Sequence, residues 1–365
     1  MIRIPQNIES LRAYKSGKTI RQIIDEFSLT QTAILWNNEN SFGCSPKAIV
    51  KMREVLNDLY LYPDPQSTSL CAKIAEINHV KPNQVVIGNG SEGLLQNIIR
   101  AFCQGKDEVL TFQGTFVIIY VWSQLNDTFC KKVPLTNTYD FDLQSMLKQM
   151  TENTKIIYLS NPNNPTGAMI SDENLRIFMT QVPKDVLVVL DEAYYEYARE
   201  ISEIYPNSIS LNYPNMLTIR TFSKVYGLAG IRVGYAMGPE NLISTLMRVK
   251  LTFEPSVIAQ AAGEGAIDDD VFLQKTVVNN RKQLKLFYEV FERLNISYVP
   301  SFANFVMIDM GKPEIAQELF EKLLHKGVFV RLIAAFGLPH CIRITIGTPK
   351  ENQFFLTALE SIIKT

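Results

Sequence analysis

The chain has 365 residues, of which 46% are hydrophobic and 20% are charged, a composition typical of a folded globular protein rather than a disordered one. Its formal net charge is −1, so no overall positive charge attracts nucleic acid or an anionic membrane. The first residues lack the apolar core of a signal peptide, and apolar runs such as 116–122 are too short to span a bilayer. We therefore expect a cytoplasmic protein that binds neither nucleic acid nor a membrane.

Cysteine and histidine are few, and their spacing predicts no metal site. The five cysteines, at positions 44, 71, 103, 130 and 341, have no paired spacing. The three histidines, at 79, 325 and 340, match no ligand pattern with a cysteine or carboxylate. We expect reduced thiols that pack as small hydrophobic side chains, and no bound metal.

From about residue 45, short apolar runs alternate with segments of helical periodicity. Ser45 and Pro46 form a helix N-cap followed by a proline in the first turn. The apolar runs lie at 85–88, 109–112, 155–160, 186–190, 216–222 and 233–238. Several of them are apolar on both faces, and most are separated by helical stretches. This pattern predicts an α/β fold with a mainly parallel sheet between two layers of helices.

The pattern changes after about residue 255. A long helical segment at roughly 270–294 is followed by predicted strands near 296–299, 304–310, 328–333 and 341–347, with helices at about 313–327 and 349–363. Strands with fewer helices between them predict a smaller α+β domain. We expect an N-terminal arm at 1–35 with a short helix and no strand, a large domain at 36–254 and a small C-terminal domain at 255–365.

Two short motifs resemble phosphate-binding loops. The stretch VVIGNGSEG at 85–93 has the glycine spacing of a dinucleotide-binding turn between a strand and a helix. Such a site needs an acidic residue at the end of the next strand, but Asp107 and Glu108 come before that strand. The segment SGKT at 16–19 lacks the first glycine of a phosphate loop and has no preceding strand. Neither motif defines a site alone, and an ordinary glycine turn is the alternative for both.

Three further stretches place polar residues after predicted strands. Asn164 lies in the loop that follows 155–160, and Asp191 directly follows 186–190, with Tyr194 three residues later. Lys224 lies just after 216–222 and is preceded by two hydroxyl residues, Thr221 and Ser223. Arg232 comes eight residues after Lys224. Because loops at the carboxyl ends of parallel strands converge on a ligand site, we expect these side chains to share one cleft with the turn after 85–88.

This combination of groups matches the requirements of pyridoxal phosphate. The cofactor's aldehyde needs a lysine, and its ring nitrogen needs a carboxylate in order to stay protonated. Its 3-oxygen accepts hydrogen bonds from an amide and a phenol, and its phosphate needs N–H groups at a helix start, hydroxyls and a cation. Asp191 could instead be a helix cap and Lys224 a surface lysine. Three motifs in order, each after a strand, favour the cofactor.

The motifs PNNPTG, DEAYYEY, TFSK and GLAGIRVGY together resemble those of fold-type I pyridoxal-phosphate aminotransferases. Over almost the whole chain, the sequence resembles more narrowly the histidinol-phosphate aminotransferase family. That resemblance rests also on AYKSGK (13–18), NENSFG (38–43), YPDP (62–65), GNGSEG (88–93), NFVMI (304–308) and VRLIAAFGLPHCIRITIGT (330–348). The lysine loop and PNNPTG are specific to the superfamily, whereas YPDP and the pair of Arg331 and Arg343 are closer to the family.

The resemblance implies a role for each matched residue. Lys224 is the catalytic residue, which holds the cofactor as a Schiff base and then moves a proton between substrate and cofactor. Asp191 pairs with the ring nitrogen, and Asn164 and Tyr194 bind the 3-oxygen. Phe116 stacks on the ring. The phosphate is bound by Gly90, Ser91, Glu92, Thr221, Ser223 and Arg232.

The resemblance also implies a homodimer, because Tyr62 reaches the phosphate in the neighbouring subunit. Arg343 binds the substrate carboxylate, or helps Arg331 to hold a substrate phosphate. Tyr14 and Asn304 line the substrate end of the site. Departures from the family pattern at Trp36 and at 334–336 are expected beside the substrate rather than the cofactor.

The implied reaction is transamination of L-histidinol phosphate with 2-oxoglutarate to imidazole-acetol phosphate and L-glutamate, a step of histidine biosynthesis. An aromatic amino-acid aminotransferase and a threonine-phosphate decarboxylase of the same fold are alternatives, because they share the cofactor residues. An NAD-dependent dehydrogenase that uses GNGSEG is the alternative from another class, and it leaves Lys224 and Asp191 unexplained. A catalytically silent binding protein on this fold is a further alternative, against which the intact Lys224 argues.

Overall fold

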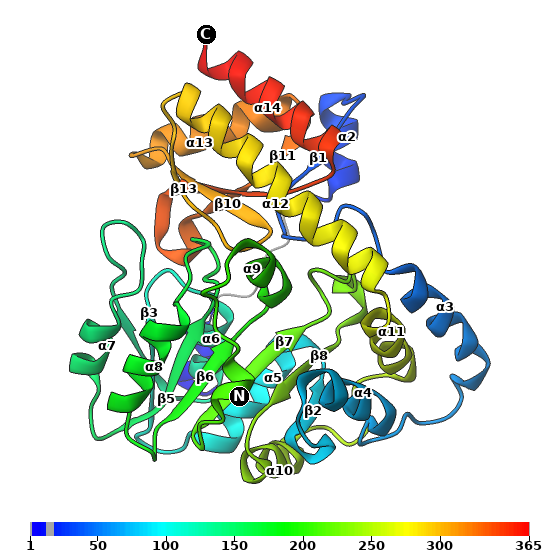
Figure 1. Cartoon of the computed structure of the whole chain (residues 1–365). Helices are drawn as coiled ribbons and strands as arrows, with labels where there is room; N and C mark the ends of the chain where they lie inside the picture. Colours follow the sequence, from blue (N-terminus) through cyan, green and yellow to red (C-terminus); the bar gives the residue numbers. More distant parts are fainter. Residues whose placement is uncertain (1, 12–17, 365) are drawn as a thin grey trace.

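A seven-stranded sheet forms the centre of the computed structural model, which describes residues 2–11 and 18–364 (Figure 1). Its strands, in spatial order, are β2 (Val85–Gly88), β8 (Gly234–Met237), β7 (Met216–Thr221), β6 (Leu187–Asp191), β5 (Thr154–Ser160), β3 (Glu108–Phe112) and β4 (Phe129–Val133). β8 runs antiparallel to β2 and β7, and the other neighbours are parallel. The prediction of a mainly parallel sheet is confirmed.

Helices cover both faces of this sheet, because successive strand residues point to opposite sides. In β6, Val188 packs with the residues of α8 (Asp172–Gln181), whereas Val189 packs with those of α5 (Gly90–Phe102). The other helices here are α3 (Pro46–Glu54), α4 (Thr68–Asn78), α6 (Ile118–Leu125), α7 (Leu143–Gln149), α9 (Tyr195–Ile201), α10 (Glu240–Val249) and α11 (Val257–Ile267), with 3-10 turns η1 (Leu56–Asp58), η2 (Pro82–Gln84), η3 (Ser208–Leu211) and η4 (Ala229–Ile231).

A second, antiparallel sheet lies above the first in Figure 1. Its strands, in spatial order, are β12 (Arg331–Ile333), β13 (Leu338–Thr345), β10 (Phe305–Asp309) and β9 (Ser297–Val299). α12 (Asp270–Arg293), α13 (Pro313–His325) and α14 (Pro349–Ile363) accompany it, with the 3-10 turn η5 (Ala334–Phe336). The three helices begin at the predicted residues, each at a proline or after a capping side chain.

Two expectations about strands are wrong. The first 35 residues contain α1 (Gln6–Glu9) and α2 (Ile20–Phe27), but also β1 (Ala33–Ile34), which pairs in parallel with β11 (Val328–Phe329). The single strand predicted at 328–333 is therefore divided between two sheets. Ala33 and Leu35 are fully buried in the core of the smaller sheet, so the end of the predicted arm belongs to that core.

Among the described residues, no helix has both the length and the apolar character that crossing a membrane requires.

Candidate active site

The carboxyl ends of β5, β6 and β7 open into a cleft of about 290 Å³, close to the lower end of the range for small-molecule sites. The N-terminus of α5 borders the same cleft. Besides Ser160, Ala193 and Ala229, it is lined by side chains that the sequence analysis selected: Ser91, Glu92, Phe116, Asn164, Asp191, Tyr194, Thr221, Ser223, Lys224 and Arg232.

Asp191 is the last residue of β6, and its carboxylate is 2% exposed. Burial raises its pKa to about 6, although hydrogen bonds from the Tyr158 hydroxyl (2.8 Å to Oδ2) and the Ala193 N–H (3.2 Å to Oδ1) favour the charged form. Lys224 favours it as well. The result is an oriented carboxylate with little water around it, which is suited to pairing with a cationic ring nitrogen.

Lys224 lies in the loop after β7, and its Nζ is 5.8 Å from the centre of the Tyr194 ring. Burial lowers the pKa of its amine to about 8, and the charges of Arg343 and Arg232 act in the same direction, against those of Glu39 and Asp191. An amine with this pKa loses its proton near neutral pH, so Lys224 can serve as a nucleophile or a base.

The start of α5 borders one corner of the cleft and provides groups that are suited to an anion. Gly90 has a φ of +72°, and a Cβ at this position would lie 2.9 Å from Nη2 of Arg232, so glycine allows the guanidinium to come close. The first-turn N–H groups of a helix point at whatever lies before it. On the other side, Thr221 Oγ1 donates to Ser223 Oγ at 3.0 Å. A cation, hydroxyls and helix N–H groups thus surround one position, as binding of a phosphate requires.

The side chains of Asn164 and Tyr194 each accept a hydrogen bond from a neighbouring residue. Nη1 of Arg343 donates to Oδ1 of Asn164 at 2.5 Å, which leaves the amide N–H groups of Asn164 for another partner. The Tyr194 hydroxyl accepts from Nδ2 of Asn38 at 2.9 Å. Both residues can therefore offer a donor to an oxygen in the cleft.

Arg343 is buried, and its Nε has no hydrogen-bond partner within the described ranges 2–11 and 18–364. Burial, with the repulsion of Arg331, lowers its pKa to about 10. Arg331 lies directly opposite Arg343 in the pairing of β12 with β13. Two guanidinium groups side by side are suited to a doubly charged or a second anionic group.

Besides Gly90, Arg331 and Arg343, described above, three further selected residues do not line this cleft or cannot be placed. The side chain of Asn304 donates from Nδ2 to the backbone carbonyl of Asn38 at 3.1 Å. Tyr62 is 79% exposed and stacks on Phe253 with 4.2 Å between ring centres. Tyr14 and most of the AYKSGK motif lie outside the described residues.

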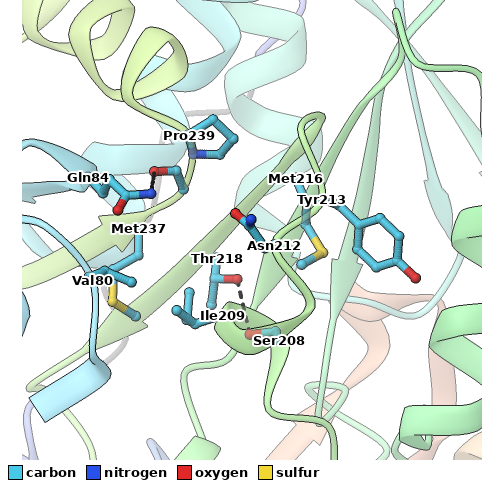
Figure 2. Close-up of a pocket in the computed structure, with 11 residues that line it drawn as sticks. Val80, Gln84, Ser208, Ile209, Asn212, Tyr213, Met216, Thr218, Met237 and Pro239 are labelled. Carbon is cyan, nitrogen blue, oxygen red and sulfur yellow. Dashed lines mark hydrogen bonds between the residues drawn. The ribbon is translucent and has the colours of Figure 1, made fainter.

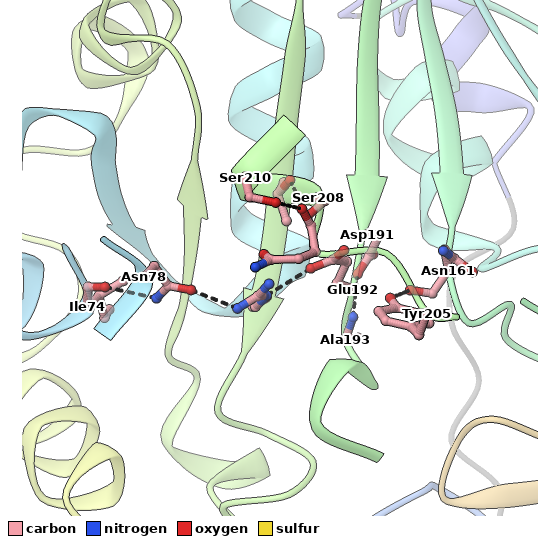
Figure 3. A network of polar contacts seen from close by, with 12 residues as sticks. Ile74, Asn78, Asn161, Asp191, Glu192, Ala193, Tyr205, Ser208 and Ser210 are labelled. Carbon is pink, nitrogen blue, oxygen red and sulfur yellow. Dashed lines mark hydrogen bonds and ion pairs between the residues drawn. The ribbon is translucent and has the colours of Figure 1, made fainter. Parts of the chain in front are cut away.

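Two buried polar residues that contact this site were given no role from the sequence. Tyr158 lies inside the apolar run of β5. Asn38 is the first residue of the NENSFG motif, which supports the family resemblance but gave no function for this side chain. Next to the strand ends, Arg220 of β7 pairs with Glu192, the residue after Asp191, at 2.8 Å between Nε and Oε2, and also donates to Asn78 at 2.9 Å. Figure 3 shows Asn78 and Glu192 in this network, beside Asp191. This buried pair joins the ends of β6 and β7, which carry Asp191 and Thr221.

A hollow on another side of β7 contains no comparable chemistry (Figure 2). It holds about 30 Å³, room for little more than a water molecule, and none of its lining side chains is charged. Its polar contacts are local, such as the hydrogen bond from Thr218 to Ser208 at 3.1 Å.

The spacing of the histidines matches no ligand pattern, but the fold brings His340 close to a cysteine and a carboxylate. Ligand atoms of Asp309, His340 and Cys341 lie within 4.8 Å of one another, because β10 and β13 place Asp309 opposite Cys341. The Tyr139 hydroxyl lies among them, 2.5 Å from Asp309 Oδ2 and 3.0 Å from His340 Nε2. These contacts tie the loop before α7 to the smaller sheet.

Comparison with known proteins identifies the class to which this fold and cleft belong. The sequence profile of the family "Aminotransferase class I and II" matches residues 33–359. The chain therefore belongs to the class I and II aminotransferases, and it is an aminotransferase rather than a dehydrogenase.

Its relatives define the family more narrowly. The chain is 38% identical to histidinol-phosphate aminotransferase 1 of Idiomarina loihiensis, over 97% of this chain and 96% of the relative. It is 39% identical to the histidinol-phosphate aminotransferase of Bacillus velezensis, over 99% and 100%. A crystal structure of the Sinorhizobium meliloti histidinol-phosphate aminotransferase in complex with pyridoxal-5'-phosphate matches with a TM-score of 0.89 and 28% identity, over 100% of this chain and 98% of that one. The resemblance to the histidinol-phosphate aminotransferase family is thus confirmed.

Proposed function

We propose that the protein is a cytoplasmic, homodimeric pyridoxal-phosphate enzyme that transaminates L-histidinol phosphate with 2-oxoglutarate. The observation that carries the proposal is the convergence of Lys224, Asp191, Asn164 and Tyr194 with the N-terminus of α5 in one cleft. The relatives' names supply the substrate, and the solved relative contains pyridoxal phosphate.

The groups in the cleft fit this cofactor at each of its polar ends. When bound, pyridoxal phosphate supplies an aldehyde that reacts with amines and a ring that accepts electrons. Arg232, Thr221, Ser223 and the first turn of α5 suit its phosphate. At the far end of the cleft, the buried carboxylate of Asp191 suits its ring nitrogen, and Phe116 provides an aromatic face.

Each residue would contribute a separate step of the chemistry. Asp191 would hold a proton at the ring nitrogen, because a buried carboxylate is stabilised by a cationic partner. Lys224 would provide the amine that binds the cofactor, and its neutral form would move a proton at the substrate carbon. The low pKa of its amine, about 8, makes the neutral form accessible for that transfer.

The two arginines support a substrate with a strong anion. The buried Nε–H of Arg343 lacks a partner, and Arg331 lies beside it in the sheet. Phosphate and carboxylate both accept the planar pair of donors that a guanidinium offers. Glutamate and histidinol phosphate could therefore use the same arginines in the two halves of the reaction.

Exposed apolar residues around Tyr62 support the homodimer. Leu59, Tyr60, Leu61, Tyr62, Leu251 and Phe253, which we call the Tyr62 patch, are all exposed in the single chain. The two segments of the patch are connected by the stacking of Tyr62 on Phe253 and by a hydrogen bond from Lys250 to the Pro65 carbonyl at 2.9 Å. An exposed patch of large apolar side chains is typical of a protein interface.

A half-reaction screen tests the substrate. The holoenzyme is mixed in turn with histidinol phosphate, phenylalanine, tyrosine and threonine phosphate, and conversion of the bound cofactor to its amine form is followed by absorbance. We expect fast conversion with histidinol phosphate. Conversion only by the aromatic amino acids, or decarboxylation of threonine phosphate, would select an alternative of the same fold. Nicotinamide-dependent reduction without any visible cofactor band would contradict the proposed class of enzyme.

A further inference from the structure

Asn38 is a buried asparagine whose polar groups all have partners. It is 1% exposed, and its backbone is in the left-handed region, with a φ of +59°. Its N–H donates to Thr345 Oγ1 at 2.9 Å, and its carbonyl accepts from Asn304 Nδ2 at 3.1 Å. Its side chain contacts Tyr194 and Thr345. Asn38 therefore connects β13, the strand of Arg343, with the tyrosine at the start of α9.

These contacts determine the orientation of the Asn38 amide. Thr345 Oγ1 accepts from the Asn38 N–H at 2.9 Å and donates its own hydrogen to Asn38 Oδ1, 3.1 Å away. In the opposite orientation, two N–H donors would face the same threonine oxygen, and the threonine hydrogen would lack this acceptor. The amide nitrogen consequently faces Tyr194, and because it can only donate, the phenol oxygen accepts.

The orientation of the Asn38 amide determines the direction in which the Tyr194 hydroxyl can donate its hydrogen. Asn38 occupies one acceptor position of the Tyr194 oxygen and takes no proton from it. The phenol's single hydrogen is therefore available in another direction, and Tyr194 lines the cleft together with Asn164 and Lys224. In that direction it can be donated to an anionic oxygen bound between Tyr194 and Asn164.

We propose that Asn38 is a positioning residue, whose side-chain amide holds the Tyr194 hydroxyl so that the phenol donates its proton to the ring oxygen of the bound cofactor. The inference rests on the proposed binding of pyridoxal phosphate in this cleft. It adds a residue that is absent from the lining of the cleft.

The substitution Asn38→Asp tests this role, because it keeps the size of the side chain but removes the amide donor to Tyr194. The introduced carboxylate accepts the phenol's proton and turns it away from the cleft. We expect the affinity of the apoprotein for pyridoxal phosphate, measured by fluorescence titration, to fall about tenfold. We also expect the apparent pKa of the holoenzyme's visible band to rise by about one unit, because a ring oxygen without its donor holds a nearby proton more tightly.

A double-mutant cycle separates positioning from an effect of the added charge. Tyr194→Phe alone should produce the same two changes, and Asn38→Asp should add nothing in that background. Asn38→Ser, which is neutral and too short to reach the phenol, is measured in parallel in case the carboxylate variant does not fold. Asn215→Asp is the matched control: Asn215 is also buried, but it lies at the start of β7 and donates to the Pro183 and Val186 carbonyls.

The outcomes distinguish this inference from the proposed function. If the wild-type protein binds pyridoxal phosphate but both Asn38 variants keep its affinity and titration, the positioning role is overturned. It is also overturned if the effect of Asn38→Asp persists in the Tyr194→Phe background, or if Asn215→Asp reproduces it. If the wild-type protein binds no pyridoxal phosphate, the proposed function fails, and the inference that rests on it fails as well.

Discussion

Lys224 carries most of the chemistry that we assign to this chain. It is the amine in the cleft with a pKa lowered toward neutrality, and Asp191 lies across the same cleft. We predict that Lys224→Ala lowers the rate of transamination at least about 1,000-fold, because both the attachment group and the proton carrier are lost. A coupled assay for glutamate formation measures this rate. Circular dichroism and retained noncovalent binding of pyridoxal phosphate are the controls, and near-normal turnover by the folded variant would contradict the role.

The pKa of Lys224 gives a prediction about pH. Because only the neutral amine attacks an aldehyde, capture of pyridoxal phosphate by the apoprotein should speed up with rising pH and level off above about 8, instead of continuing to the usual 10.5. Stopped-flow absorbance measures this rate. Arg343→Gln should move the midpoint upward, because the charge of Arg343 helps to lower the pKa. A wild-type midpoint close to 10.5 would contradict the buried amine.

The same pKa implies a change in stability of the apoprotein. The native amine loses its proton near pH 8, whereas the unfolded one does so near 10.5. Below pH 8 the native state therefore bears the full cost of a buried charge. This cost declines as the pH rises from 8 to 10.5, so Lys224 alone makes the free energy of unfolding increase over that range.

At the residue scale, the sequence predicted which candidate side chains share the cleft where such a side chain ends or follows a strand. Asp191 and the loops of Asn164 and Lys224 follow apolar runs, and parallel strands bring such positions together. Asn38, although part of the NENSFG motif, and Tyr158 were given no role because their partners are distant in the chain: Asn38 meets Tyr194 and Thr345, and Tyr158 meets Asp191 on the next strand. Their own neighbours in sequence give no signal of these contacts.

At the scale of elements, the packing of β8 against the start of α5 fixes the corner of the cleft where we propose that the phosphate binds. A Cβ on Gly234 would lie 2.9 Å from the Arg220 carbonyl oxygen and 3.0 Å from the Ser91 nitrogen. Both are backbone atoms, which cannot move independently of their elements. The close approach of β8 to α5 therefore requires glycine at this position.

We predict that Gly234→Ala pushes α5 away from β8. The free energy of unfolding should fall by about 1–3 kcal/mol, as overpacking does, and affinity for pyridoxal phosphate should weaken about tenfold or more. Denaturant unfolding and cofactor titration measure these effects. Gly230→Ala is the control, since a Cβ at Gly230 meets no atom within 4 Å. Equal behaviour of the two variants would contradict the importance of this contact.

The elements that sequence patterns missed are short or lie at an edge. β1 has two residues, too few for any periodicity, and its place is determined by pairing with β11. β4 is an edge strand whose residues are largely solvent-accessible, so it lacks an apolar run. The sequence also does not predict that β8 runs antiparallel to its neighbours, because a strand's own residues do not indicate the direction of the strands beside it.

At the scale of the whole molecule, we propose that each cleft receives Tyr62 from a second subunit. Tyr62 is exposed and absent from the lining of its own cleft, whereas the Tyr62 patch is available to a partner. We predict that Tyr62→Ala weakens cofactor affinity of the dimer and that Phe253→Asp shifts the protein toward monomer. Titration and sedimentation velocity measure these two changes.

Hybrid dimers test the exchange of Tyr62 directly. A subunit with Tyr62→Ala is co-refolded with a subunit that carries Lys224→Ala. If Tyr62 acts across the interface, one of the two clefts of each hybrid has an intact Lys224 and an intact Tyr62. Random pairing of equal amounts makes about half of the dimers hybrids, so activity recovers to about a quarter of the wild-type value per subunit. If Tyr62 acted within its own chain, every cleft would contain a lesion and mixing would restore nothing.

The most direct test of the central claim is to locate the cofactor on the chain. Reduction of the pyridoxal-phosphate-loaded protein with borohydride fixes the cofactor to the lysine that holds it, and peptide mass mapping identifies that residue. We predict one modified site, Lys224, which is lost in Lys224→Ala. Attachment to another lysine, or a protein that is not modified at saturating pyridoxal phosphate, would contradict the account.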